Sequence, residues 1–307
     1  MNALRVVRRT VAPPADMAAA PAITVAALVI ALAAALVVAT GEARAQSSRR
    51  ARSAEAPAVP QVRRRTVVVD AGHGGVDRGM TGTTPSHGRI YEKDITLQVA
   101  RRVASRLETA GVNVIMTRTS DTLIALSDRG RIANRQAGDL FISIHVNAAN
   151  PHWKDPGAAR GYETYFLAEA KTEDERRVAA MENEVVRFET DADMPKDDAL
   201  GFMLNDMAQN EHLRESSDLA ETIQGRLGWA HPGPSCGVKQ AGFRVLVTAF
   251  MPAVLVEIGF GTNRAEAAWI SSADGQLQIA DAITRATLDY LARYERRVGG
   301  GSTGRGK

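Results

Sequence analysis

The chain has 307 residues, of which 45% are hydrophobic and 24% charged, a composition typical of a folded globular protein rather than a disordered or fibrous one. Its formal net charge of +3 falls to +1 without residues 1–45, because that segment holds four of the 38 basic and two of the 35 acidic residues. A nucleic-acid-binding domain keeps a marked basic excess, so we expect no nucleic-acid partner. The single cysteine, Cys236, excludes an intrachain disulfide and a multi-cysteine metal site.

The N-terminal segment has the pattern of an export signal. Arg8 and Arg9 precede an uncharged apolar stretch at 17–41, and the small-residue cleavage motif Ala-Arg-Ala follows at 43–45. We therefore predict a signal peptide over residues 1–45, a periplasmic or extracellular cell-wall location, and no membrane attachment of the mature form. Two alternatives stay open: the apolar stretch is long enough to anchor the chain in a bilayer, and the paired arginines suit twin-arginine export.

A single folded domain is expected over residues 65–296. Residues 46–64 are rich in serine, proline and charge and are interpreted as a linker, and residues 297–307 are a glycine-rich tail that we expect to be disordered. Within the domain, β-branched segments alternate with amphipathic stretches, which predicts an α/β sheet flanked by helices. The expected strands are Thr66–Asp70, Asn113–Arg118, Leu140–His145, Tyr162–Phe166, Arg244–Val247 and Ala253–Ile258, and the expected helices are Lys93–Ala110, Leu126–Ala137, Ser217–Leu227 and Asp274–Arg296.

Residues 168–215 interrupt this alternation with a long helical insertion. Eleven acidic and five basic residues lie between Glu169 and Asp198, and a run of charge usually marks a solvated surface. Val178 and Val185 are among the apolar residues spaced between these charges, so one face of the insertion has something to bury. We therefore expect an insertion that packs on the domain and can cover a site.

Four polar residues lie next to strand ends or helix starts, where the functional loops of an open α/β sheet gather. His73 follows the first strand in Asp-Ala-Gly-His-Gly-Gly, and Glu92 immediately precedes the first helix. His145 ends an apolar strand, and Glu257 ends another. A turn, a helix cap or a hydrogen-bonded core residue is the alternative explanation for each alone. An unpaired buried carboxylate costs several kcal/mol, so Glu257 needs a partner.

Taken together, two histidines and one carboxylate form a donor set that catalytic zinc uses, with one coordination position left for water. A second carboxylate nearby can then act as general base. The pattern therefore indicates a zinc site. The other four histidines lie in loop or charged contexts and are expected at the surface: His87, His152, His212 and His231.

The motifs VVVDAGHGG, YEKDITL, TRTSD, DLFISIHVNA, GVKQAGFRVL and MPAVLVEIGFGTN, in this order, resemble those of the zinc-dependent N-acetylmuramoyl-L-alanine amidases of bacterial peptidoglycan. The resemblance covers about residues 67–294. It implies one α/β domain with a mostly parallel six-stranded sheet, one Zn²⁺ bound by His73, Glu92 and His145, and Glu257 as the catalytic acid/base. The implied reaction is hydrolysis of the amide between N-acetylmuramic acid and the L-alanine of the stem peptide, in cell-wall turnover or daughter-cell separation.

The chain departs from the family pattern in two places. Ala71 stands where proline is common, and residues 83–89 lengthen the loop before Glu92, but neither change removes a ligand. Three polar residues near the motifs are candidates to orient the substrate or its oxyanion: Asn147, Lys239 and Gln240.

The insertion at 168–215 suggests autoinhibition. Some members of the family carry a helical insertion over the zinc that an activator protein lifts, and this segment lies in the corresponding place. The alternative is an insertion that only widens the substrate groove. The carboxylates that are candidates to approach the metal belong to Glu182, Glu184 and Glu189.

Two rival functions stay open at this point. A zinc peptidase acting on the stem peptide can use the same ligands, and a non-catalytic wall-binding protein can keep the same fold. The presence of all four predicted catalytic residues favours an enzyme, with peptidoglycan as substrate and a monomer as the expected state.

Overall fold

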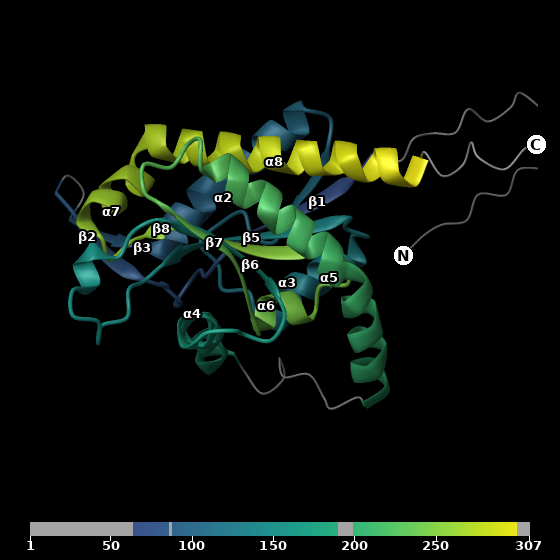
Figure 1. Ribbon diagram of the computed structural model, residues 1–307, viewed down its shortest axis with the longest axis horizontal. Coiled ribbons are helices and arrows are strands. Elements are labelled where there is room, and N and C mark those ends of the chain that lie inside the picture. The colour runs from purple at the N-terminus through teal and green to yellow at the C-terminus, as the bar shows by residue number, and fades with distance from the viewer. Residues whose placement is uncertain (1–63, 86–87, 190–198, 300–307) are drawn as a thin grey trace, which may run out of the picture. The chain divides into compact units, whose positions relative to one another are not determined.

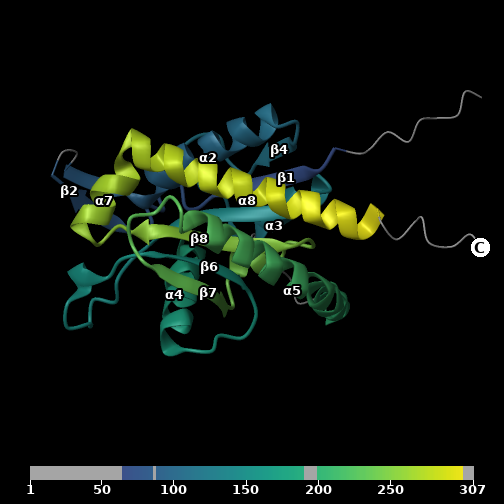
Figure 2. The same ribbon diagram turned by 45° about the horizontal axis from the view of Figure 1, so that its top comes forward.

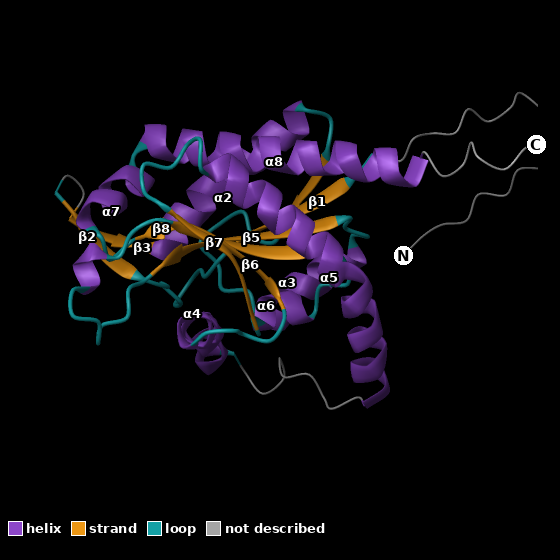
Figure 3. Cartoon of the chain, viewed as in Figure 1, coloured by secondary structure: helices purple, strands orange, loops and turns teal. Residues whose placement is uncertain are grey.

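The computed structural model describes residues 64–85, 88–189 and 199–299. These residues form a six-stranded sheet and a separate two-stranded hairpin (Figures 1 and 3). Every pair of neighbours in the large sheet is parallel except β8 and β6, so the predicted mostly parallel α/β fold is confirmed. In spatial order the strands are β4 (Asn113–Met116), β1 (Thr66–Ala71), β5 (Leu140–Asn147), β8 (Ala253–Phe260), β6 (Tyr162–Leu167) and β7 (Ser235–Ala241).

Helices cover both faces of the large sheet (Figures 1 and 2). One face packs against α2 (Glu92–Thr109), α5 (Ala199–Leu227) and α8 (Ala273–Gly299), which bury an apolar cluster against alternate strand residues. The other face packs against α3 (Leu126–Arg135), α4 (Glu173–Asn183) and α6 (Arg244–Val247). The remaining elements are the hairpin strands β2 (Thr81–Thr84) and β3 (Gly88–Tyr91), helix α7 (Arg264–Ser271), and the 3-10 helices η1 (Pro156–Ala158) and η2 (Glu184–Phe188).

The face that packs against α3, α4 and α6 changes from apolar to polar along the strands. Successive strand residues point to opposite faces, so every second residue shares a face. On β5, buried Phe141 is followed on this face by Ser143 and His145, and on β8, Leu255 is followed by Glu257. The apolar core therefore gives way to a buried polar region at the carboxyl ends of both strands.

The predicted strand Arg244–Val247 is wrong. These residues form the short helix α6, in which the consecutive residues Val245 and Leu246 are both buried. The sixth strand is instead β7, whose residues are mostly half-buried and whose Gly237 has a φ of 87°. A segment of four residues, two of them β-branched, is too short to separate a strand from one helical turn, and β7 lacks the apolar alternation that identifies strands.

The insertion and the chain ends also differ from expectation. Helix α4 and η2 lie within residues 168–215, and α5 joins the predicted helix Ser217–Leu227 to the C-terminal part of the insertion as one helix of 29 residues. Helix α8 continues to Gly299, so the first residues of the predicted disordered tail are helical.

The predicted signal peptide and almost all of the predicted linker lie outside the described residues, and so does the tail from residue 300 onward. Within the described part of the chain, no helix combines the length and the apolar character needed to cross a membrane. In the lengthened loop before Glu92, residues 83–84 belong to β2 and residues 88–89 to β3 of the hairpin.

Candidate metal centre

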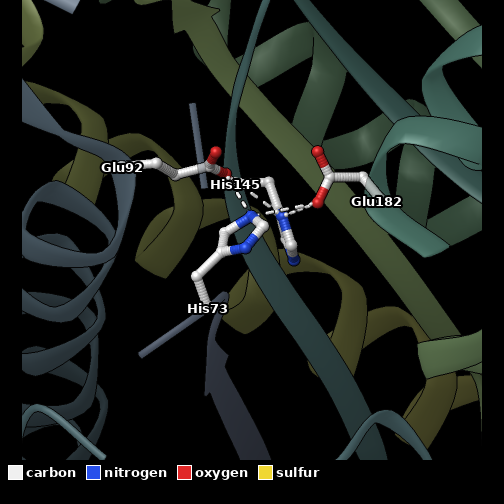
Figure 4. A group of neighbouring side chains, drawn as sticks. All are labelled: His73, Glu92, His145 and Glu182. Carbon is white, nitrogen blue, oxygen red and sulfur yellow. Dashed lines mark ion pairs between the residues drawn. The ribbon is translucent and has the colours of Figure 1, made fainter. Parts of the chain in front are cut away.

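Four buried side chains converge at the carboxyl ends of β1 and β5. His73, Glu92, His145 and Glu182 each offer one ligand atom, and these atoms lie within 4.8 Å of one another. Figure 4 shows the carboxylates of Glu92 and Glu182 approaching the two imidazoles from opposite sides. The three ligands expected from the sequence therefore lie together, and Glu182 of the insertion joins them.

The contacts among these four side chains, called the metal group below, are short. The Glu92 Oε1 atom lies 3.0 Å from Nε2 of His73 and 3.2 Å from Nδ1 of His145. The Glu182 Oε2 atom lies 3.1 Å and 2.7 Å from the same two nitrogens. Each carboxylate thus bridges both imidazoles.

Two glycines permit this close approach. A Cβ atom at Gly72 would lie 2.5 Å from Nε2 of His145, and one at Gly79 would lie 2.5 Å from Oε2 of Glu92. Gly79 also has a φ of 63°, a left-handed conformation that side chains rarely adopt. The motif glycines therefore make room for the ligands as well as for the turn.

Outer contacts orient the ligands. The Nδ1 atom of His73 lies 2.6 Å from Oδ2 of Asp77, which turns its Nε2 atom toward the group. The backbone N–H groups of Met80 and Val146 donate to the two oxygens of Glu92, each at 2.8 Å. Such contacts fix the ring orientation and carboxylate direction that a metal site requires.

The electrostatics of the group favour positive charge at its centre. Burial alone would lower the pKa of both imidazoles, but nearby carboxylates outweigh it, so the pKa of His73 lies well above its usual value and that of His145 is raised to about 9. Burial likewise opposes ionisation of Glu92, yet the imidazoles lower its pKa below the ordinary range. The site therefore stabilises cationic charge between acidic side chains.

The donor atoms fit a divalent metal ion. Nε2 of His73, Nδ1 of His145 and Oε2 of Glu182 are buried and have no hydrogen-bond partner. Buried polar atoms normally have one, so these three require an explanation. Imidazole nitrogens and carboxylate oxygens are the donors of catalytic zinc sites, and a cation between them would satisfy all three atoms.

Glu257 lies beside this group. Parallel and antiparallel register align His145 of β5 with Glu257 of β8, and Glu257 with Glu163 of β6. Glu257 is fully buried, and neither of its oxygens has a hydrogen-bond partner. Burial and the neighbouring carboxylates raise its pKa well above the usual value. A carboxyl group of this kind can take up and release a proton during catalysis.

Glu163 is a site residue that the sequence analysis does not identify. Its Oε1 atom accepts hydrogen bonds from Asn147 Nδ2 at 2.5 Å and from the Tyr165 hydroxyl at 2.8 Å, and its Oε2 atom pairs with Lys239 Nζ. An acidic residue inside the apolar strand Tyr-Glu-Thr-Tyr-Phe was the available signal. Two of the three predicted substrate-orienting residues thus meet at one buried carboxylate.

The remaining candidates lie elsewhere. Gln240 donates to the backbone carbonyl of Glu169. Glu184 is exposed and pairs with Arg187, and Glu189 accepts from the backbone N–H of Leu126. Of the three glutamates expected to approach the metal, only Glu182 belongs to the metal group.

The expectation of a surface position is wrong for His231. This residue is 7% exposed, and its ring lies 4.9 Å from that of Tyr162 and 4.7 Å from that of Trp269. Burial lowers the pKa of His231 to about 4. The aromatic neighbours come from β6 and α7, so local sequence context could not reveal them. His152 is exposed and His212 half-buried, while His87 lies outside the described residues.

Comparison with known proteins identifies the family. A family model described as N-acetylmuramoyl-L-alanine amidase (Amidase_3) matches residues 67–289. The chain is 32% identical to the amidase AmiA of Escherichia coli K12, over 76% of this chain and 78% of that protein. It is 34% identical to the amidase AmiC of Neisseria meningitidis serogroup B, over 75% and 53% of the two chains.

Solved structures agree with this match. The amidase from Clostridium difficile 630 is 30% identical, with a TM-score of 0.55, over 75% of this chain and 97% of that one. The amidase AmiC2 of Nostoc punctiforme is 28% identical, with a TM-score of 0.54, over 75% and 98%. Because the family match spans most of the chain and the buried His/Glu group suits a metal-dependent hydrolase, this protein belongs to the N-acetylmuramoyl-L-alanine amidases, enzymes that act on peptidoglycan.

Proposed function

We propose that this enzyme is zinc-dependent and that His73, Glu92 and His145 hold one Zn²⁺ ion. The observation that carries the proposal is the convergence of two buried imidazole nitrogens, which form no hydrogen bond, on two buried carboxylates. When bound, zinc would lower the pKa of a water molecule from ~15.7 towards ~7 and polarise the substrate carbonyl. The bond cleaved is the amide between the lactyl carbonyl of N-acetylmuramic acid and L-alanine.

Glu257 is the proposed acid/base. Its raised pKa lets it accept the proton of the attacking water and return it to the leaving amine of L-alanine. Its position opposite His145 in the β5–β8 register supports this role, because it keeps the carboxyl group next to a metal ligand.

Asn147 and Lys239 are proposed to orient the substrate. Both are bound to Glu163, so their side chains are held at a fixed place beside Glu257. The ammonium group of Lys239 suits the carboxylates of an acidic stem peptide. Gln240 is left out of this role because its side-chain amide is bound to a backbone carbonyl.

Helix α4 is proposed to be an autoinhibitory lid whose Glu182 takes the fourth ligand position. Val178 and Ala179 of α4 are buried against the sheet, and a Thr172–Glu175 capping box begins the helix. The side chain of Asn183 at its C-terminal end binds the backbone of residues 242 and 244. A lid held by these contacts needs a partner to displace it, and we propose an activator protein in that role.

We further propose that the protein is exported through its N-terminal signal and acts as a monomer in the periplasm or the cell-wall space. Its role there would be cell-wall turnover or daughter-cell separation. Cleavage of the leader and twin-arginine export belong to the same proposal, since both rest on residues 1–45.

One experiment tests the proposed reaction. Residues 46–307, with and without Glu182→Ala, are incubated with purified peptidoglycan and zinc, and released fragments are identified by mass. Intact stem peptides beginning with L-alanine are expected, together with loss of release after chelation and recovery on adding zinc. Release of shorter peptides would support a stem peptidase instead. No release from either protein or from a variant lacking residues 172–196, all folded and zinc-loaded, would contradict the amidase proposal and favour a wall-binding role.

A further inference from the structure

Three successive peptide carbonyls at the His73 turn face two buried arginines. The carbonyl of Ala71 accepts from Arg118 Nε at 2.9 Å and from Arg129 Nη1 at 2.7 Å. The carbonyl of Gly72 accepts from Arg118 Nη2 at 2.8 Å. The carbonyl of His73 itself accepts from Arg129 Nη2 at 2.9 Å. The two guanidinium groups thus fix every peptide plane that leads from β1 into the turn.

The backbone of this turn is in a conformation that needs such support. His73 has a φ of 60°, in the left-handed region that residues with a side chain rarely adopt. A strained residue of this kind persists only where surrounding contacts hold it. Arg129 binds the His73 carbonyl while the imidazole reaches Glu92 and Glu182, so the strained conformation is the one that presents the metal-binding nitrogen.

A single buried carboxylate links this turn to the second histidine strand. Asp70 Oδ1 lies 2.8 Å from Arg129 Nη1, and Asp70 Oδ2 accepts from Ser143 Oγ at 2.7 Å. Asp70 and Ser143 are register partners on β1 and β5, and Ser143 precedes His145 by two residues on the same face. Asp70 and Arg129 are respectively 0% and 1% exposed, so the charge of each is balanced mainly by the other.

We infer that Arg129, assisted by Arg118 and Asp70, is a positioning residue that holds His73 ready to bind the metal ion. The inference rests on the proposed function, because it assumes that His73 is a zinc ligand. Arg129 uses Nη1 for Asp70 and Ala71, Nη2 for His73 and Nε for the carbonyl of Ile124. Only a planar guanidinium spans these acceptors, since a lysine ammonium is a single compact donor group.

Arg129→Lys tests the inference directly. Zinc affinity of the purified protein is measured by competition with a chelator, and the cobalt-loaded protein is examined by visible absorption spectroscopy. Loss of an outer contact to a ligand typically weakens metal binding ~10- to 100-fold, and we expect a loss of that size with an altered cobalt spectrum. Arg131→Lys is the matched control, because Arg131 is two residues away on α3 and forms an exposed pair with Asp128.

Two further variants separate positioning from stability. Val103→Ala destabilises the opposite core, where Val103 is buried, without touching the turn. Arg118→Lys alters the contacts to the Ala71 and Gly72 carbonyls of the same turn without changing Arg129, so it tests the support of the turn if Arg129→Lys does not fold. Unchanged zinc affinity and cobalt spectrum in the folded arginine variants, with only a melting-temperature loss like that of Val103→Ala, would overturn the inference. Equal zinc binding by wild type and His73→Ala would instead overturn the proposed ligand set.

Discussion

The Oε2 atom of Glu182 lies 2.7 Å from Nδ1 of His145. Both side chains are buried. His145 belongs to β5 and Glu182 to α4, and strand β6 lies between these two elements in the sequence. The contact places an acidic side chain of the insertion among the atoms that suit a metal ion. Helix α4 therefore contributes one side chain to the metal group.

Removal of the Glu182 carboxylate is expected to raise basal activity. Removing one partner of a buried ion pair typically costs about 3–5 kcal/mol, so Glu182→Ala should weaken the closed position of α4 and raise stem-peptide release by about 10-fold or more in the absence of any activator. Deletion of residues 172–196 should act in the same direction. Glu184→Ala is the control, because Glu184 is exposed and pairs only with Arg187 among the described contacts. Unchanged activity in folded, zinc-loaded Glu182→Ala and deletion proteins would argue for an insertion that only shapes the groove.

Substitutions of Glu257 and of the histidine ligands should have different effects on zinc binding and activity. Glu257→Gln is expected to bind zinc as the parent protein does and to lose hydrolysis by about 10²–10⁴-fold, because general acid/base catalysis contributes that range. His73→Ala is expected to lose both zinc and activity. Metal content and product release, measured in the Glu182→Ala background so that the parent is active, check both. Activity close to the parent level in Glu257→Gln would assign the proton transfer to another group.

Lys239 is expected to affect substrate binding and stability separately. Lys239→Met should raise KM by about 10-fold with a smaller effect on kcat, as loss of one charged contact predicts. It should also lower the melting temperature, because it leaves the buried Glu163 carboxylate without its cation. Adding Glu163→Gln should restore the melting temperature but not KM. Lys171→Met on the exposed surface is the control, and an unchanged KM in both Lys239 variants would remove Lys239 from the substrate site.

His231 should make folding stability depend on pH. Burial depresses its folded pKa to about 4 from an ordinary value near 6.5, so below pH 6.5 the unfolded chain takes up a proton that the folded chain does not. The contribution of the neutral His231 ring to the free energy of unfolding is therefore fully present above pH 6.5. It is lost as pH falls towards 4, by an amount of the order of 2–3 kcal/mol.

Chemical denaturation at pH 7 and pH 4.5 measures this effect. Wild type should lose more stability over that interval than His231→Gln, whereas His152→Gln, altered at an exposed histidine, should follow wild type. Equal losses in wild type and His231→Gln would mean that the buried ring is protonated in the folded state.

Local sequence patterns predicted most strands of the sheet and the position of most candidate site residues. Alternating β-branched and amphipathic segments predicted five of the six strands of the sheet. The buried face of a strand repeats every two residues and that of a helix every three to four, so local sequence indicates both. The same local pattern placed His73, His145 and Glu257 at strand ends, and the carboxyl ends of neighbouring strands meet at one edge of a sheet. The motifs that resemble the amidase family lie on these segments.

The identity of the acidic residue that enters the metal group depended on tertiary structure. Glu182 lies on the buried face of α4, four residues after Val178, and that spacing is visible in the sequence. What this face covers is not visible, because it depends on how α4 packs against a sheet formed from distant segments. Local patterns could not select Glu182 over Glu184 and Glu189 for this reason.

The same limit applies to the residues that support the site. Arg129 meets the His73 turn, Glu163 meets Lys239, and His231 meets Trp269 only after strands and helices far apart in the chain are packed together. Sequence periodicity records which face of an element is buried but not which partner it is buried against. The sequence therefore determined the fold class and the proposed zinc ligands, whereas the packing of distant elements decided the lid contact, the buried supports of the ligands and the choice of β7 over residues 244–247 as the sixth strand.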